Sequence, residues 1–181
     1  MSRPPDKPHG AAADGFAPPP HLLILQTEHW LINHRVDSAL PGYLMLGART
    51  ATNDLAAMPR EALDQLGPLL ASAQSALSEI LRPDHLYIGR YGHSAGHALH
   101  FHVIPICRWV KESFLADPRY RVLSTLVDPV TAVDTQATDG AELTLYVWRE
   151  FCESPTPPPA SGPSIGDVVN FLRERLSGRF S

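Results

Sequence analysis

The stretch ALHFHVIPI, residues 98–106, predicts a buried strand that carries two histidines. Side chains alternate between the two faces of a strand, so His100 and His102 share one face and the apolar residues between them share the other. The preceding loop adds His93 and His97, which brings four of the nine histidines into residues 93–102. Two buried imidazoles need polar partners, and this loop is polar rather than apolar. We therefore favour a functional site over a pair of structural core histidines.

Three kinds of site are compatible with these residues. A neutral imidazole can attack phosphorus at physiological pH, while a second one holds phosphate oxygens or helps the leaving group, and backbone amides of the Ser/Gly loop cradle the phosphate. In this scheme, one ring nitrogen of the nucleophile donates to a fixed acceptor, which we expect to be a backbone carbonyl. The scheme also needs an open cavity that admits the anion. The alternatives are a metal site made by His97, His100 and His102, and a noncatalytic nucleotide-binding module.

The residues before this strand predict the rest of a sheet. Runs at 21–26 and 29–36, the turn DSALPG and the run 43–48 read as strands and a hairpin, and 85–92 returns to the strand period. Between them an apolar stripe from Pro59 predicts a helix that ends before Arg82, kinked or split in two at Gly67-Pro68. We expect an α+β fold, a curved and mainly antiparallel sheet of about five strands with packed helices.

The two ends of the chain predict additional segments. Residues 1–20 are rich in Pro, Gly and Ala and predict a disordered tail, and residues 154–163 predict a linker. Asp139 and Glu142 have the spacing of a helix cap, ahead of a helix over 141–153. Ser164 and Asp167 repeat that spacing ahead of an amphipathic C-terminal helix over 164–181. Residues 21–153 are thus expected to form the main domain with a helical extension.

Composition excludes several classes of partner. A net charge of −4 and a pI near 6.1 do not suit a protein that binds bulk nucleic acid. The two cysteines, Cys107 and Cys152, make neither a disulfide framework nor a CxxC metal pair. The sequence shows no signal peptide pattern and no apolar run of about 20 residues, so we expect a cytoplasmic protein with no membrane partner.

HFHVIP, residues 100–105, resembles the second half of the signature of the histidine triad (HIT) superfamily of nucleotide hydrolases and transferases. The order of strand, Pro-Gly turn, strand, long helix and strand over roughly residues 22–107 is similar to that of the superfamily. The resemblance implies that His100 is the nucleophile toward an α-phosphate and that His102 contacts phosphate oxygens. It implies hydrolysis or nucleotidyl transfer of dinucleoside polyphosphates or nucleoside phosphoramidates through a nucleotidyl-histidine. It also implies a homodimer. We expect no metal held by protein ligands, and Mg²⁺ is expected only as a possible counterion of the substrate.

The resemblance assigns further positions and shows two departures. It implies that Asn33 approaches the ribose or phosphate, and that Ser94, Gly96 and His97 lie in the phosphate-facing loop; Trp30 is a separate candidate for lining a base pocket. The first triad position holds Ala98, and Gly42-Tyr43 stands where the superfamily commonly has Gly-His. Transferases that keep only His-x-His indicate that a nucleophile and one partner can suffice.

Overall fold

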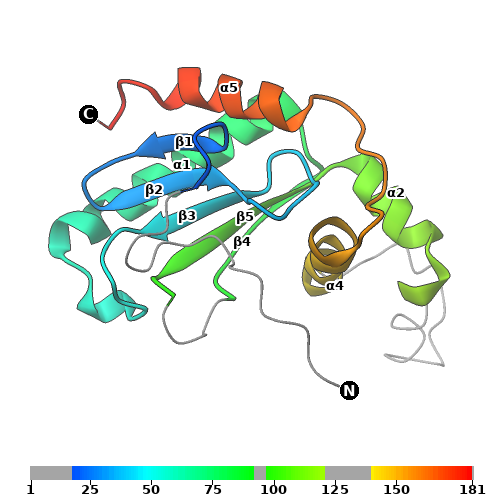
Figure 1. Cartoon of the computed structure of the whole chain (residues 1–181), viewed down its shortest axis with the longest axis horizontal. Coiled ribbons are helices and arrows are strands. Elements are labelled where there is room, and N and C mark those ends of the chain that lie inside the picture. Colours follow the sequence, from blue (N-terminus) through cyan, green and yellow to red (C-terminus); the bar gives the residue numbers. More distant parts are fainter. Residues whose placement is uncertain (1–17, 92–96, 121–139, 181) are drawn as a thin grey trace.

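The computed structural model describes residues 18–91, 97–120 and 140–180 and contains one five-stranded antiparallel sheet (Figure 1). The strand order is β1-β2-β3-β5-β4, which places β5 between β3 and the edge strand β4. The strands are β1 (Leu23–Gln26), β2 (Trp30–His34), β3 (Leu44–Ala48), β4 (His85–Gly89) and β5 (His100–Ile106). The predicted α+β fold class is confirmed, and the strand predicted from the two histidines is an interior strand of the sheet.

Helices lie on both sides of this sheet. In Figure 1, α1 passes behind the strands and α5 runs along β1. The helices α2 and α4 lie to the right of the strands. The helical segments are η1 (Leu55–Ala57), α1 (Arg60–Leu81), α2 (Arg108–Ala116), α4 (Gly140–Val147), the π-helical η2 (Trp148–Glu153) and α5 (Ile165–Leu176). The helix predicted over 141–153 is therefore α4 followed by η2, while its predicted cap residue Asp139 lies outside the described residues.

The predicted split of the long helix at Gly67-Pro68 is wrong, because α1 continues through Pro68 as one helix. Pro68 removes one backbone donor, but burial of the residues that follow it holds the helix together. Leu69, Ala73 and Leu77 are each at most 2% exposed and belong to the core between α1 and the sheet.

Strand alternation sends two sets of side chains to two different cores. Trp30, Ile32 and Val103 belong to the core beneath α1 and α5. Met45 and Ile104 belong to the second core, which packs against α2, α4 and η2. His100 and His102 have the parity of Ile104, so they lie on the face away from α1.

The C-terminal helix is part of the first core. Ser164 and Asp167 form the predicted capping box, and the apolar residues Val168, Val169 and Leu172 are at most 1% exposed. The guanidinium of Arg173 donates to the Leu23 carbonyl at 2.7 Å and to the Pro20 carbonyl at 2.5 Å. Residues 18–20 of the predicted tail are thus attached to the body, and residues 1–17 lie outside the described residues.

The turn between β2 and β3 positions the residue that follows it. Gly42 has φ +81°, and a Cβ there would lie 2.5 Å from Leu81 Cδ1 at the end of α1, so this position needs glycine. Tyr43 comes next, and its carbonyl accepts from the Arg35 amide at 2.8 Å across the hairpin. This close fit fixes where the Tyr43 ring enters the second core.

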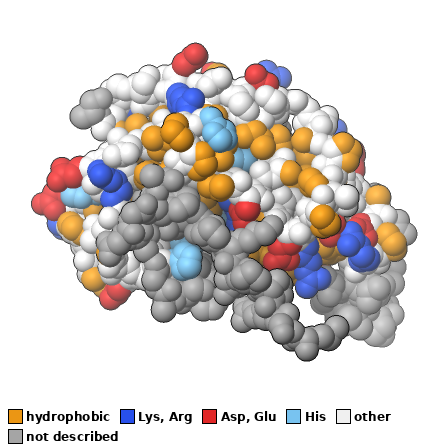
Figure 2. All heavy atoms as spheres, in the orientation of Figure 1, with side chains coloured by type: hydrophobic (Ala, Val, Ile, Leu, Met, Phe, Trp, Pro, Cys, Tyr) orange, Lys and Arg blue, Asp and Glu red, His pale blue; other side chains and the backbone are white. Residues whose placement is uncertain are grey.

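On the face drawn in Figure 2, acidic and basic side chains of the described residues are interspersed. Among the helices of the described part of the chain, none has the length and apolar character needed to cross a membrane.

Candidate active site

The two histidines of β5 lie side by side on one face of the sheet, as predicted. Their ring centroids are 5.2 Å apart with an edge-on arrangement. His100 is opposite Gly47 of β3, whose lack of a side chain leaves room beside the ring, and His102 is opposite Met45. Both rings are buried, 4% and 3% exposed, rather than facing the open cavity that we expected.

Packing by two tyrosines accounts for the burial of His102. The Tyr43 ring lies 5.9 Å from the His102 ring and the Tyr91 ring lies 5.3 Å from it, centroid to centroid. Tyr91 itself is 49% exposed.

A backbone carbonyl orients His100. Its Nδ1 is 2.8 Å from the carbonyl oxygen of Ala98, which can only accept, so Nδ1–H donates and Nε2 keeps its lone pair. This confirms the predicted backbone acceptor. The acceptor is the main chain of Ala98, so the orientation of His100 does not depend on the side chain at position 98. Burial lowers the pKa of His100 and the Ala98 carbonyl opposes this, with the net result that the neutral ring is favoured.

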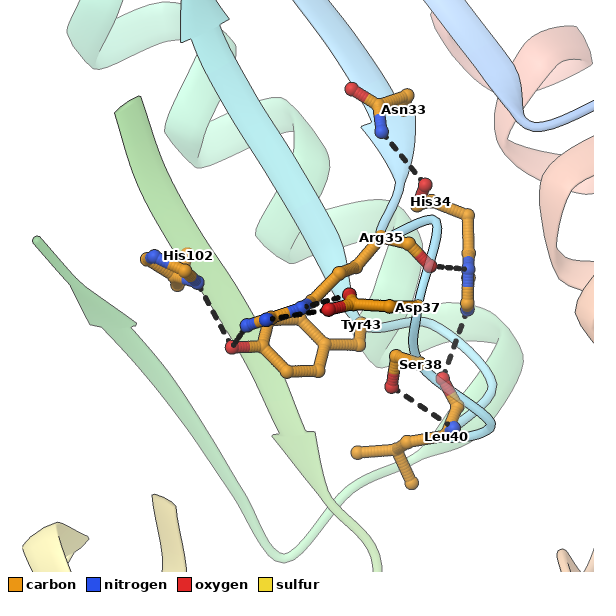
Figure 3. Close-up of polar contacts among 8 residues, drawn as sticks. All are labelled: Asn33, His34, Arg35, Asp37, Ser38, Leu40, Tyr43 and His102. Carbon is orange, nitrogen blue, oxygen red and sulfur yellow. Dashed lines mark hydrogen bonds and ion pairs between the residues drawn. The ribbon is translucent and has the colours of Figure 1, made fainter. Parts of the chain in front are cut away.

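Tyr43 connects His102 to a buried arginine. The Tyr43 hydroxyl oxygen is 2.9 Å from His102 Nδ1 and accepts from Arg35 Nη1 at 2.8 Å (Figure 3). A guanidinium only donates, and a hydroxyl oxygen accepts up to two hydrogen bonds, so the contact with Nδ1 is compatible with either neutral tautomer of His102. Burial raises the pKa of Tyr43, which keeps that hydroxyl protonated.

Arg35 is a buried cation that supports this hydroxyl. It is 2% exposed, and its Nε and Nη2 donate to the two carboxylate oxygens of Asp37 at 2.6 and 3.1 Å. Burial lowers the pKa of Arg35, but the hydrogen bonds to Asp37 together with the charge interactions with Tyr43, Cys152 and Asp37 raise it overall. The guanidinium also lies 4.1 Å from the ring centroid of Trp148 in η2. Asp37, Arg35, Tyr43 and His102 thus form one continuous polar chain.

His34 and Asn33 hold the turn on which Arg35 and Asp37 lie. The His34 ring nitrogens are each 2.9 Å from a carbonyl oxygen, of Arg35 and of Leu40, and the Asn33 amide donates to the His34 carbonyl at 2.7 Å. Asn33 stands in register with Met45, the neighbour of His102, so it lies on the predicted face. Its amide is engaged with the backbone and it is 1% exposed, so a contact with ribose or phosphate stays a prediction.

Trp30 is the site prediction that the structure contradicts. Its side chain is fully buried in the α1 core, and its indole N–H donates to the Ala62 carbonyl at 2.8 Å. It therefore faces the opposite side of the sheet from the two histidines and cannot line a pocket with them.

The loop predictions have mixed outcomes. Ser94 and Gly96 lie outside the described residues. His97 is described and partly buried, with its Nδ1 buried and without a hydrogen-bond partner among the described residues. The described residues contain no group of three or more His, Cys, Asp or Glu side chains arranged to hold a metal ion.

Arg35, Asp37 and Tyr91 were not predicted from the sequence. Tyr43 carried a signal, because it occupies the position after the hairpin glycine where similar proteins have histidine. Arg35 and Asp37 carried none, because a charged pair in a turn is usually solvated.

The fold and the site together define an α+β protein that presents two neighbouring imidazoles from one face of a strand. No protein-family model and no curated protein matches the sequence. Solved structures similar in fold include a Zn-bound histidine triad family protein from Mycobacterium smegmatis, with a TM-score of 0.49, 16% identity and coverage of 88% of this chain and 86% of that one. A hypothetical histidine triad nucleotide-binding protein from Sulfolobus tokodaii strain 7 has a TM-score of 0.46 and 12% identity, over 86% of this chain and 83% of that one.

A histidine triad protein from Bradyrhizobium japonicum is similar with a TM-score of 0.42 and 20% identity, over 70% of this chain and 84% of that one. All three are histidine triad proteins, the superfamily that residues 100–105 resemble. At these identities and TM-scores the likeness concerns the fold, so the function proposed next is based on the residues of this chain.

Proposed function

We propose that this protein hydrolyses or transfers a nucleotide by attack of His100 on its α-phosphate, through a nucleotidyl-histidine. The observation that carries the proposal is the different hydrogen bonding of the two neighbouring rings, and we assign to His102 the tautomer in which Nδ1 accepts from Tyr43. His100 offers a lone pair at Nε2, and His102, 5.2 Å away between ring centroids, offers an N–H at Nε2. A nucleophile and a proton donor side by side are what displacement at phosphorus requires.

The reaction has two balanced steps. In the first, His100 Nε2 forms a bond to phosphorus while the bond to the leaving group breaks, and the leaving atom takes the proton of His102 Nε2. Nδ1 of His102 takes the Tyr43 hydroxyl proton, and Arg35 stabilises the phenolate. In the second, water attacks phosphorus, the bond to His100 breaks, and the water proton returns to His102 as Tyr43 recovers its own. Burial raises the pKa of Tyr43, and Arg35 acts in the opposite direction, toward the phenolate.

A quench experiment tests this proposal. Protein is incubated with a dinucleoside polyphosphate or a nucleoside phosphoramidate, radiolabelled at the α-phosphate, and quenched in alkali, because a phosphohistidine-type bond is labile in acid. We expect an acid-labile adduct and turnover in the wild type and neither in His100→Ala. His85→Ala is the matched control, because His85 is exposed on β4. An adduct that survives in His100→Ala would refute the proposal.

The second candidate is a noncatalytic nucleotide-binding module, which the burial of both rings favours. Nucleotide binding by both the wild type and His100→Ala, with turnover by neither, would establish it. Elemental analysis of the purified protein tests the alternative of a metal site. A stoichiometric transition metal would refute both the hydrolase or transferase proposal and the binding-module proposal.

We further propose that Mg²⁺ acts only as a substrate counterion and that the chain pairs into a homodimer. In support of pairing, β4 forms an outer edge of the sheet, and Ile88 on it is 39% exposed. Sedimentation at micromolar concentration tests the dimer, and Ile88→Lys is expected to shift it to monomer. Equal adduct formation with and without a chelator would show that Mg²⁺ is dispensable for the chemical step.

A further inference from the structure

A cavity of about 480 Å³ lies between α5 and the strand ends beside it. In Figure 1, α5 runs along β1, and the cavity opens where this helix begins. Its described lining comes from residues 21–38 and 165–173. The two imidazoles of the candidate active site are on β5, so this cavity is a separate place in the fold.

Helical spacing sets the side of α5 that lines this cavity. Gly166, Asn170 and Arg173 follow one another at steps of four and three, which places them on one face of the helix. A long side chain on a helix points back toward the helix N-terminus, and the 3.2 Å bond from Arg173 Nη1 to Asn170 Oδ1 has that direction. Asp167 lies on an adjacent face, where its Oδ2 accepts from the Ser164 amide at 3.0 Å in the helix cap.

The hydrogen bonds of Arg173 fix its guanidinium without neutralising its charge. Nε donates to the Leu23 carbonyl at 2.7 Å, Nη2 donates to the Pro20 carbonyl at 2.5 Å, and Nη1 donates to the Asn170 side chain. All three acceptors are neutral oxygens, and the three bonds use three of the five N–H groups of a guanidinium. A cation held in this way is complementary to a carboxylate or phosphate group.

Other lining residues add further donors and an apolar wall. The Asn170 side-chain oxygen accepts from Arg173, so its NH₂ group is the donor that it offers to a ligand. His21 is exposed on the other side of the cavity and carries an N–H in either neutral tautomer. Leu22 and Val36 contribute aliphatic side chains, and Val36 is 39% exposed. The lining therefore combines polar donors with apolar surface.

We propose that this cavity binds a small organic anion, with its carboxylate or phosphate group on Arg173, Asn170 and His21 and its apolar part against Leu22 and Val36. The anion supplies the charge compensation that neutral oxygens cannot give to the guanidinium. Its apolar part covers aliphatic surface that is otherwise exposed to water. The site goes beyond the proposed function and does not depend on it, because His100 and His102 take no part in it.

Three probe compounds test the site. Benzoate carries both a charge and an apolar ring, benzamide keeps the ring without the charge, and acetate keeps the charge without the ring. ¹H–¹⁵N spectra should show saturable shifts of the Gly166 and Asn170 amides with benzoate. We expect benzoate to bind at least about 10-fold more tightly than either benzamide or acetate, because each of these lacks one of the two contacts.

Variants of α5 assign the binding to this cavity. Arg173→Gln should weaken benzoate about 10-fold, and Arg175→Gln is its control, since Arg175 pairs with Glu79 at 3.0 Å on the surface. Gly166→Leu should abolish binding by filling the cavity. A Cβ at this position lies 3.8 Å from Ser164 Oγ, which is an ordinary contact, so the variant should keep the fold. Gly67→Leu on the exposed side of α1 is its control.

The active site is separated from this cavity by one further variant. His100→Ala should bind benzoate with the affinity of the wild type, whether or not the protein turns over nucleotides. Absence of saturable shifts at Gly166 and Asn170 in about 50 mM benzoate would overturn the proposal. Equal affinity for benzoate and benzamide, or benzoate binding that survives in Gly166→Leu, would overturn it as well.

Discussion

Replacing Tyr43 with phenylalanine removes a single oxygen that joins a buried cation to His102, the proposed proton donor. The hydroxyl accepts from Arg35 at 2.8 Å and donates to His102 Nδ1 at 2.9 Å, and both partners are at most 3% exposed. Water cannot readily replace it there. Losing one charge-assisted bond of about 1.5–3 kcal/mol and one neutral bond of about 0.5–1.5 kcal/mol predicts a stability loss of about 2–4.5 kcal/mol.

The effect on chemistry follows from the tautomer. Without the hydroxyl, the preference of His102 for a proton at Nε2 loses about 1–2 kcal/mol, which leaves about 5- to 30-fold less of the competent tautomer. The proton relay is lost as well, so we expect the single-turnover rate of Tyr43→Phe to fall by about 10- to 100-fold. Poor leaving groups, which need the proton most, should show the larger loss.

Two measurements separate this role from general damage to the fold. Rapid-quench kinetics with leaving groups of graded basicity give the rate, and long-range ¹H–¹⁵N spectra report which nitrogen of His102 is protonated. Tyr120→Phe is the control, because it removes a hydroxyl that donates to Glu150 at 2.8 Å in the packing between α2 and η2. It should lower stability without changing the rate or the tautomer. Wild-type spectra with the His102 proton on Nδ1 would refute the reasoning.

Four further outcomes are expected. Because burial lowers the pKa of His100, adduct formation measured from pH 5 to 8 should decline only below pH 6.5. The free energy of unfolding should decrease over the same range, because as the pH falls the unfolded chain binds the proton before the folded chain does. Arg35→Met leaves the Asp37 carboxylate without its partner and should cost about 3–5 kcal/mol in urea denaturation. Leu172→Ala in α5 should cost about 2–5 kcal/mol by the same measurement, whereas the loss would be small if α5 were not part of the core. Ser164→Ala removes the α5 cap and should cost about 0.5–2 kcal/mol.

Strand periodicity was enough to predict the arrangement of the two histidines, because alternation on β5 is a local property of the backbone. Helix amphipathicity likewise predicted α1 and α5. It did not predict that α5 would join the same core as α1, because an apolar helix face does not specify the surface against which it packs. Trp30 shows the limit of reading residue type alone: its indole suits a base pocket as well as a core, and only the register of β2 decides between them. The hydrogen bond between Tyr43 and His102 joins the turn before β3 to β5. Such a long-range contact cannot be predicted from the spacing of residues in the sequence.

The buried arginine explains how the site can differ from the motif that it resembles. An imidazole that donates a proton from Nε2 needs a group at Nδ1 that donates to it and stays protonated at neutral pH. A tyrosine hydroxyl meets that need when burial raises its pKa, and it can be held in place by a donor that never accepts, which is what a guanidinium provides. Arg35 in turn requires a carboxylate, and Asp37 supplies it two residues away in the same turn. The tyrosine at position 43 and the charge pair Arg35–Asp37 are therefore needed together. We expect Tyr43→His to keep the proposed activity only when Arg35 is also replaced. The reason is that an imidazole at position 43 cannot both accept from Arg35 and keep the geometry of Tyr43 toward His102.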